Sequence, residues 1–211
     1  MLQERLEAGL SALGLASEAP QREALCAYLA LLARWNRAFN LTAVQDPLEM
    51  VARHVLDSLS VGPYLFGPSV LDLGTGAGLP GIPLAVLYGD RDFVLLDSNG
   101  KKTRFVRQAV LELGLTNVEV IQARMESYRP ARKFATIVAR ALATLSELNA
   151  LAEPLLERPG RMLLMKGRMP SAELEALTPG SGSLTRCDVR IRRLDVPFLI
   201  GERHLIEVRL D

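Results

Sequence analysis

The 211-residue sequence has few of the residues that form metal sites or disulfide frameworks. It contains two histidines and two cysteines, Cys26 and Cys187, which lie far apart. No Cys-x-x-Cys pair or Cys/His cluster with ligand spacing is present, so the sequence predicts no zinc site and no bound metal. Two isolated cysteines suit a reducing compartment, and we expect a cytoplasmic protein.

A large charge of one sign and a long uninterrupted hydrophobic run are also missing. The chain has 25 basic and 24 acidic residues, a net charge of +1 and 49% hydrophobic residues. This balance excludes a disordered chain and a strongly basic coat, so any contact with nucleic acid must use local clusters. The longest uncharged run, residues 73–89, is broken by glycine and proline, and the first ten residues lack an apolar signal core. We expect no membrane contact, and a monomer.

The first part of the sequence has the hydrophobic spacing of helices. Leucines recur every three or four residues from Leu2 to Leu13, and apolar residues share one face of a second helix over 20–39, with Ser17 as its cap. Pro47 is expected to open a third helix. We expect residues 1–66 to form a helical extension that packs on a core of residues 67–211.

From Ser69 onward, strand-like and helix-like segments alternate, which predicts parallel βαβ units and an α/β fold. Helices are predicted over 82–87, 101–113, 142–156 and 172–177, and a loop over 178–183. The predicted strands cover residues 69–73, 93–97, 118–122, 134–139, 161–166, 184–194 and 205–210.

A glycine-rich turn with the sequence DLGTGAGLPG, residues 72–81, follows the first predicted strand. Residues 76–81 match the GxGxxG pattern of dinucleotide-binding proteins, which favours NAD. Against this, the match begins two positions after the strand ends, and Asp72 would repel a pyrophosphate. Pro80 also removes a backbone donor from the start of the helix that would hold phosphate.

A cationic ligand without phosphate reverses this electrostatic argument. S-adenosylmethionine carries a sulfonium and an ammonium group, which the Asp72 carboxylate would attract directly or through water. Asp97, at the end of the second strand, is placed to accept the ribose hydroxyls of an adenosine, although NAD would use the same acid. These features favour S-adenosylmethionine over NAD, and both over a tight turn without a ligand.

Several motifs along nearly the whole chain resemble the bacterial small-subunit ribosomal RNA methyltransferase G family, also called the glucose-inhibited division protein B family. The most specific is the LPGIPLA extension of the glycine loop. Met125 is a departure, because smaller or branched residues are common there. The motifs are WNRAFNLTAV (35–44), RHVLDSL (53–59), DLGTGAGLPGIPLA (72–85), LLDSNGKK (95–102), ARMES (123–127), VARAL (138–142), LLMKG (163–167) and GERHLI (201–206).

The resemblance implies a class I S-adenosylmethionine-dependent methyltransferase fold. This fold is Rossmann-like, with a mostly parallel seven-stranded sheet, here preceded by the helical extension. The implied reaction transfers a methyl group from S-adenosylmethionine to N7 of one guanine in the decoding region of 16S rRNA. The implied partner is 16S rRNA or an assembling small ribosomal subunit.

The resemblance also implies which residues bind the cofactor. Gly74 and Leu79 would line it in the first loop, Met125 and Glu126 would hold the adenine, and Arg140 would bind a carboxylate or phosphate. The glycine pattern adds Gly76, and the strand position adds Asp97. On spacing alone, a buried Leu79, a solvated Glu126 and a surface ion pair at Arg140 are the competing interpretations.

Basic residues near the predicted strand ends are candidates for RNA contact: Lys101, Lys102, Arg104 and Lys166. Three of them crowd a helix start, where cations are unfavourable unless a phosphate binds there. His54 beside Asp57 is more typical of a structural histidine than of a base. No catalytic residue is assigned.

Two other functions stay open at the level of sequence. One is an NAD-dependent oxidoreductase, which the literal GxGxxG match favours. The other is a non-catalytic rRNA-binding assembly factor that keeps a cofactor pocket.

Overall fold

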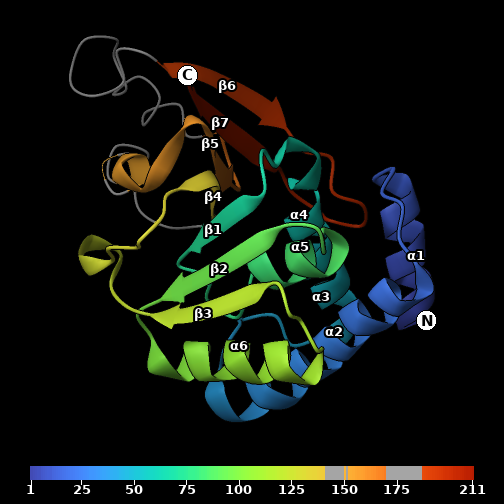
Figure 1. Cartoon of the computed structure of the whole chain (residues 1–211). Coiled ribbons are helices and arrows are strands. Elements are labelled where there is room, and N and C mark those ends of the chain that lie inside the picture. The colour runs from blue at the N-terminus through green and yellow to red at the C-terminus, as the bar shows by residue number, and fades with distance from the viewer. Residues whose placement is uncertain (141–149, 151, 170–186) are drawn as a thin grey trace.

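The structure, a computed structural model, describes residues 1–140, 150, 152–169 and 187–211. A seven-stranded sheet in the order β3-β2-β1-β4-β5-β7-β6 forms its centre, and only β7 runs antiparallel to both neighbours, β5 and β6 (Figure 1). The strands are β1 (Ser69–Leu73), β2 (Asp92–Asp97), β3 (Val118–Gln122), β4 (Phe134–Arg140), β5 (Leu156–Lys166), β6 (Cys187–Arg193) and β7 (His204–Leu210).

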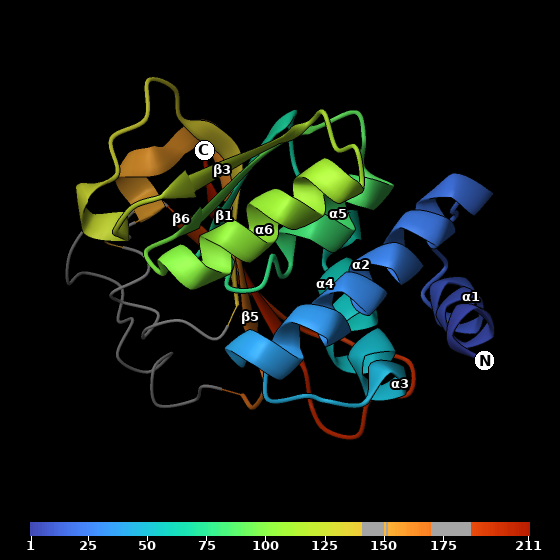
Figure 2. The same ribbon diagram turned by 90° about the horizontal axis from the view of Figure 1, so that it is seen from below.

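The helices of the first part of the chain lie on one face of this sheet (Figure 2). They are α1 (Leu2–Ala12), α2 (Ala19–Phe39), α3 (Pro47–Met50), the π-helix η1 (Val51–Leu56), α4 (Asp57–Leu59) and the 3₁₀ helix η2 (Gly62–Tyr64). The other described helices are α5 (Gly81–Leu87), α6 (Gly100–Glu112) and the 3₁₀ helices η3 (Met125–Ser127) and η4 (Glu153–Leu155).

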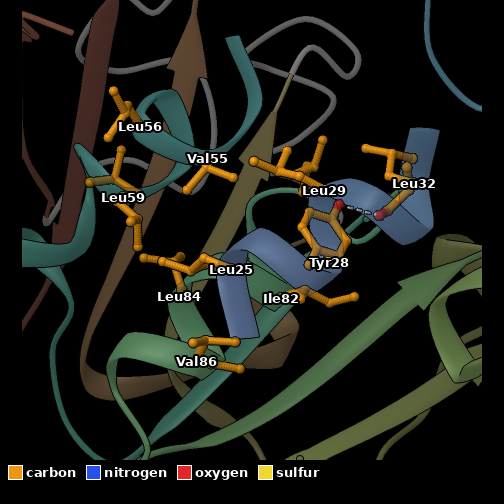
Figure 3. Packing of buried hydrophobic residues seen from close by; sticks show 14 of the residues in the cluster. Leu25, Tyr28, Leu29, Leu32, Val55, Leu56, Leu59, Ile82, Leu84 and Val86 are labelled. Atoms are coloured by element: carbon orange, nitrogen blue, oxygen red, sulfur yellow. Dashed lines mark hydrogen bonds between the residues drawn. The ribbon is translucent and has the colours of Figure 1, made fainter. Parts of the chain in front are cut away.

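Two hydrophobic clusters cover the two faces of the sheet, as the alternation of side chains along a strand requires. In β1, Val70 joins the larger cluster, while Leu71 and Leu73 join the smaller cluster on the opposite face. The larger cluster packs leucines of α2 against η1, α4 and α5, with Tyr28 at its centre (Figure 3). Residues of the first 66 positions and of the sheet therefore share one continuous core.

The element boundaries differ from the sequence predictions at several points. Ser17 does not cap α2; the cap is Glu18, whose N–H donates to Gln21 Oε1 at 2.8 Å. The expected third helix is a short α-helix that continues as a π-helix. β5 begins at Leu156, which pairs with Phe134, so this strand is longer than predicted.

Parts of the sequence prediction lie outside the described residues. These are residues 142–149 and 151 of the helix over 142–156, the helix over 172–177, the loop over 178–183 and the start of the strand over 184–194. The end of the helix predicted over 142–156 is wrong, because residues 153–155 form a 3₁₀ helix and Leu156 already belongs to β5. Apart from the longer β5, the other predicted strands and the two helices that became α5 and α6 are present within one or two residues. Within the described ranges, none of the helices has the length and apolar character needed to cross a membrane.

Candidate functional site

A cavity of about 430 Å³ opens at the carboxyl ends of the parallel strands. In an open α/β sheet, this edge is where ligands bind, and the volume is within the range of small-molecule sites. The cavity is lined by residues of the α2–α3 connection, α4, the loop after β1, the first turn of α6, the ends of β4 and β5, and the β6–β7 connection: Leu41, Thr42, Asp57, Gly74, Thr75, Gly76, Ala77, Leu79, Lys102, Arg140, Met165, Lys166, Gly167 and Arg203.

The loop between β1 and α5 has a backbone that only glycine adopts easily. Gly74, Gly76 and Gly78 have φ angles of +67°, +60° and +86°, in the left-handed region. A Cβ built on Gly76 would have no neighbour closer than 3.9 Å, so the space beside it is open. Gly74 and Gly76 thus present bare backbone to the cavity, which suits close approach by a ligand.

Asp72 supports this loop from below and does not line the cavity. Its side chain is fully buried, and Oδ2 accepts hydrogen bonds from Thr75 Oγ1 at 2.6 Å and from Gly81 N at 2.8 Å. Burial raises the pKa of Asp72 to about 6, although the hydrogen bonds from Thr75 and Gly81 oppose this shift. Asp72 therefore has no direct contact with the cavity: Oδ2 shapes the loop, and Oδ1 has no hydrogen-bond partner among the described residues.

Asp97, at the end of β2, joins the same loop from the side. Its Oδ2 accepts from Gly76 N at 2.9 Å and its Oδ1 from Asn99 N at 2.8 Å. Each carboxylate oxygen can accept a second hydrogen bond, so Asp97 keeps acceptor capacity for hydroxyl groups of a ligand. Its place beside Gly76 fits the expected contact with a ribose.

Tyr28 holds the loop from the helical side, a contact that was not predicted from the sequence. The tyrosine is fully buried in α2, and its hydroxyl donates to the carbonyl of Ala77 at 2.6 Å (Figure 3). Its ring lies 6.3 Å from that of Phe105 in α6. Burial raises the pKa of Tyr28, so the hydroxyl stays protonated and is a permanent donor. An apolar helix face gives no sequence signal for such a bond.

Two arginines and a buried aspartate form the wall of the cavity opposite the glycine loop. Asp57 is 2% exposed; its Oδ2 lies 3.3 Å from Arg140 Nη1 and its Oδ1 lies 2.9 Å from Arg203 Nε. Burial raises the pKa of Asp57, and the two guanidinium groups oppose this rise. Lys102 and Lys166 line the same cavity. The charged side chains that line it thus carry four positive charges and one negative charge.

Asp57 and Arg203 were not predicted from the sequence as lining residues. Both lie within quoted motifs, RHVLDSL and GERHLI, which are far apart in sequence. Their meeting depends on the antiparallel return of β7, which carries Arg203 next to α4 at the strand edge. The only available signal was the concentration of charged residues in those two motifs.

The structure brings together six of the predicted site residues. Gly74, Gly76, Leu79 and Arg140 line the cavity with two predicted RNA contacts, Lys102 and Lys166. Leu79 is 3% exposed and belongs to the larger hydrophobic cluster, so it packs in the core while it borders the cavity. The competing interpretation of Arg140 as a plain surface ion pair is incomplete, because its partner Asp57 is buried.

Four predicted residues lie elsewhere. Met125 and Glu126, in η3 after β3, line a separate cavity of about 440 Å³. Arg104 borders a third depression along α6, and Lys101 is exposed at the start of α6. Met125 and Glu126 are separated from the first cavity because they follow β3. Two strands, β2 and β1, lie between β3 and β4, and the end of β4 lines the first cavity.

His54 and Trp35 make contacts within the protein that suit a structural role. His54 is buried in η1, and its Nε2 lies 2.9 Å from Thr42 Oγ1, through which it touches the cavity wall. Burial lowers the pKa of His54 to about 4, so the imidazole is neutral at physiological pH. Trp35 packs edge-on against Phe105, with 5.6 Å between the ring centroids, and so joins α2 to α6.

Comparison with known proteins identifies the family. Residues 21–205 match the sequence model of the rRNA small subunit methyltransferase G family. The chain belongs to this family. It is 52% identical to ribosomal RNA small subunit methyltransferase G of Methylococcus capsulatus, with 97% of each chain covered. It is 50% identical to the protein of that name from Nitrosococcus oceani, with 97% of this chain and 93% of the relative covered.

Solved structures show the same fold at low sequence identity. An S-adenosylmethionine-dependent methyltransferase from Aquifex aeolicus matches with a TM-score of 0.58 and 16% identity, over 82% of this chain and 97% of that one. A glycopeptide N-methyltransferase complexed with S-adenosylmethionine matches with a TM-score of 0.55 and 14% identity, over 76% and 88%. The predicted methyltransferase fold with its seven-stranded sheet and helical N-terminal part is therefore confirmed, as is the predicted family.

Proposed function

We propose that this member of the methyltransferase G family transfers a methyl group from S-adenosylmethionine to N7 of one guanine in the decoding region of 16S rRNA. The observation that carries the proposal is the full-length match to the family, joined to a cavity at the expected edge of the sheet. The atom and the region of the RNA come from the family resemblance. Residues 1–66 would act as an extension that supports the cofactor loop of the domain formed by residues 67–211.

The residues around the cavity fit S-adenosylmethionine. The bare backbone of Gly74 and Gly76 would lie against the methionine part, and the free acceptor sites of Asp97 would receive the ribose hydroxyls. Leu79 offers an apolar contact. When bound, the cofactor supplies an electrophilic methyl group on a sulfonium.

The hydrogen bonding of the loop disfavours NAD. A pyrophosphate needs free backbone N–H groups at the start of the helix. Here the N–H of Gly81 donates to Asp72 and that of Gly76 donates to Asp97. These two donors are therefore already bonded to carboxylates of the protein. The occupied donors disfavour NAD, in place of a direct repulsion between Asp72 and a pyrophosphate.

Met125 and Glu126 remain proposed adenine contacts. They follow β3, which neighbours β2 and its ribose-binding candidate Asp97. A cofactor that extends from the β1 loop across the end of β2 would reach this segment with its base. Binding there would require the adenine to lie outside the first cavity, at the edge toward η3.

The reaction does not require a general base. Guanine N7 carries no proton and presents a lone pair. This nucleophile needs to be placed in line with the methyl group, so proximity and orientation are the contribution expected of the protein. His54 fits this view, because it is buried, neutral and directed to Thr42. Arg140, Lys102 and Lys166 would hold phosphate or carboxylate groups around the reacting base.

The RNA must present the guanine outside an A-form helix, whose major groove is too narrow for side chains. Because the net charge is only +1, we expect modest salt dependence of binding and a substrate that is folded or partly assembled into a subunit. Such a substrate places the enzyme in the cytoplasm, where we expect it to act as a monomer. Comparable methylation of protein-free rRNA and intact subunits would argue against the assembled substrate.

Mass spectrometry of rRNA digests from cells with and without the gene tests the proposal. We expect 7-methylguanosine at one position to disappear with the gene and to return with the wild-type copy but not with Arg140→Ala. Arg34→Ala is a matched control, because Arg34 is an exposed arginine paired with Glu112, at the end of α6 that is far from the cavity-lining Lys102. Unchanged digests would refute the proposal, and an Arg140→Ala variant that restores growth without methylation would favour an assembly factor.

A further inference from the structure

A second cluster of positive charge lies on strands β5, β6 and β7 and extends from the vicinity of the cavity toward the amino end of β5. Its centre is Glu207 of β7, whose side chain is fully buried. Oε1 lies 2.8 Å from Arg209 Nε and 3.5 Å from Arg161 Nη1, and Oε2 lies 3.2 Å from both Nε and Nη2 of Arg192. Three guanidinium groups thus share this carboxylate, so the three arginines and Glu207 together carry a net charge of +2. Asp188, which pairs with Arg190, and Asp211 at the end of the chain also act electrostatically on Arg209.

These arginines are held in place by more than the carboxylate. The guanidinium of Arg192 lies over the ring of Tyr64 at 5.0 Å, and that of Arg161 lies over the ring of Phe66 at 4.9 Å. Arg161 also donates to the carbonyl of Tyr64 at 3.4 Å. Stacked and paired arginines have already lost much of their rotamer freedom, so a ligand that binds them pays little ordering entropy.

The surplus charge is open to solvent. The side chains of Arg161, Arg192 and Arg209 are 26%, 35% and 27% exposed. One arginine is enough to neutralise Glu207, and each further guanidinium adds repulsion with its neighbours. A guanidinium carries five N–H donors, so three of them offer far more donors than two carboxylate oxygens accept. Spare, fixed donors with surplus positive charge are the features that bind phosphate groups.

The strand register places one end of this cluster, at Arg192, next to the cavity, while Arg161 lies four residues before Met165 in β5, about 13 Å along the strand. Arg192 pairs with Leu205, and Leu205 pairs with the cavity-lining Met165. Paired residues share a face of the sheet, so Arg192 lies two strand spacings, about 10 Å, from the cavity wall on the same face. A polyanion whose reacting base is in the cavity would pass over this cluster with its backbone.

From this arrangement we propose that Arg161, Arg192 and Arg209, fanned around Glu207, form a second RNA contact that binds backbone phosphates of the rRNA flanking the methylated guanine. The surface rests on the proposed function, because it names an extended partner of the same site. The arginine cluster contributes to the affinity and the orientation of the RNA, and it does not distinguish one base sequence from another. Glu207 fixes the positions of the arginines and does not touch the RNA.

The test measures the affinity of the purified protein for small ribosomal subunits from cells that lack the gene, at several salt concentrations. Each of Arg192→Gln and Arg209→Gln is expected to weaken binding about three- to tenfold near 0.1 M salt and to reduce the slope of log affinity against log salt by about one. Arg34→Gln removes the same charge from an exposed ion pair outside both cavities and is expected to change neither value.

Two further measurements separate this contact from a purely structural ion cluster. Each variant leaves two arginines on Glu207, so we expect only a small fall in melting temperature and the wild-type affinity for S-adenosylmethionine. Unchanged RNA affinity and salt slope in both variants would overturn the proposal. Failure of the proposed function is distinguishable, since the wild-type protein would then neither bind the subunits nor methylate them.

Discussion

Asp72 in β1 and Glu207 in β7 are both fully buried carboxylates, but their partners differ in kind. Asp72 accepts from a hydroxyl and a backbone N–H, and burial raises its pKa to about 6. Burial alone would also raise the pKa of Glu207, but the guanidinium groups of Arg209 and Arg192 lower it overall. Neutral donors around Asp72 shape a loop for a small ligand, whereas cations around Glu207 leave positive charge for a polyanion.

The largest expected effect is on the Glu207 side of this comparison. Glu207→Gln keeps the shape but leaves three arginines without their counter-charge, and we expect the free energy of unfolding to fall by about 3 to 5 kcal/mol at neutral pH. Since the folded pKa is below the unfolded value of 4.5, the stabilisation is present above that value and is lost as the pH falls through the folded pKa. Urea unfolding at several pH values measures both quantities.

Asp72→Asn should show the opposite dependence on pH. The folded pKa of about 6 is above the unfolded value of 3.8, so wild-type stability falls as the pH rises between these values. Over this pH range, we expect the free energy of unfolding of the variant to rise by about 2 to 3 kcal/mol relative to that of the wild type. The asparagine carbonyl can still accept from Thr75 and Gly81. Parallel pH profiles for the Asp72 and Glu207 variants would contradict the comparison.

A smaller effect is expected where the helical part of the chain meets the glycine loop. Tyr28→Phe leaves the carbonyl of Ala77 without its donor inside the core, at a cost of about 1 to 2 kcal/mol in unfolding free energy. We expect binding of S-adenosylmethionine to weaken severalfold in calorimetry, because the loop peptide is no longer fixed. Tyr88→Phe, at a half-buried tyrosine just after α5, is the control and should bind normally.

Local patterns predicted most of the fold and the glycine-loop half of the site. Period-two and period-3.6 hydrophobicity located the strands and helices, and the spacing of Gly74, Gly76 and Asp97 located the loop and the adjoining acid. The side of the loop that Asp72 faces was not predictable, because a strand-end residue can point to the cavity or beneath the loop with the same sequence spacing.

The cationic half of the site depends on contacts between distant segments. Asp57, Arg140 and Arg203 come from three parts of the chain and meet only after the sheet is complete. The cluster around Glu207 likewise needs the register of β5, β6 and β7. Charge alternation along β6 was compatible with a solvated face, so composition and spacing gave no reason to group its arginine with Arg161 or Arg209.

Methyl transfer by the purified protein tests the central claim most directly. Small subunits from cells lacking the gene are incubated with S-adenosylmethionine labelled in its methyl group, and the 16S rRNA is then treated with borohydride and aniline, which cleave the chain at 7-methylguanosine. We predict incorporation of label and cleavage at a single guanine in the decoding region. Label without cleavage would contradict the assignment to N7, and no label would contradict the methyltransferase reaction itself.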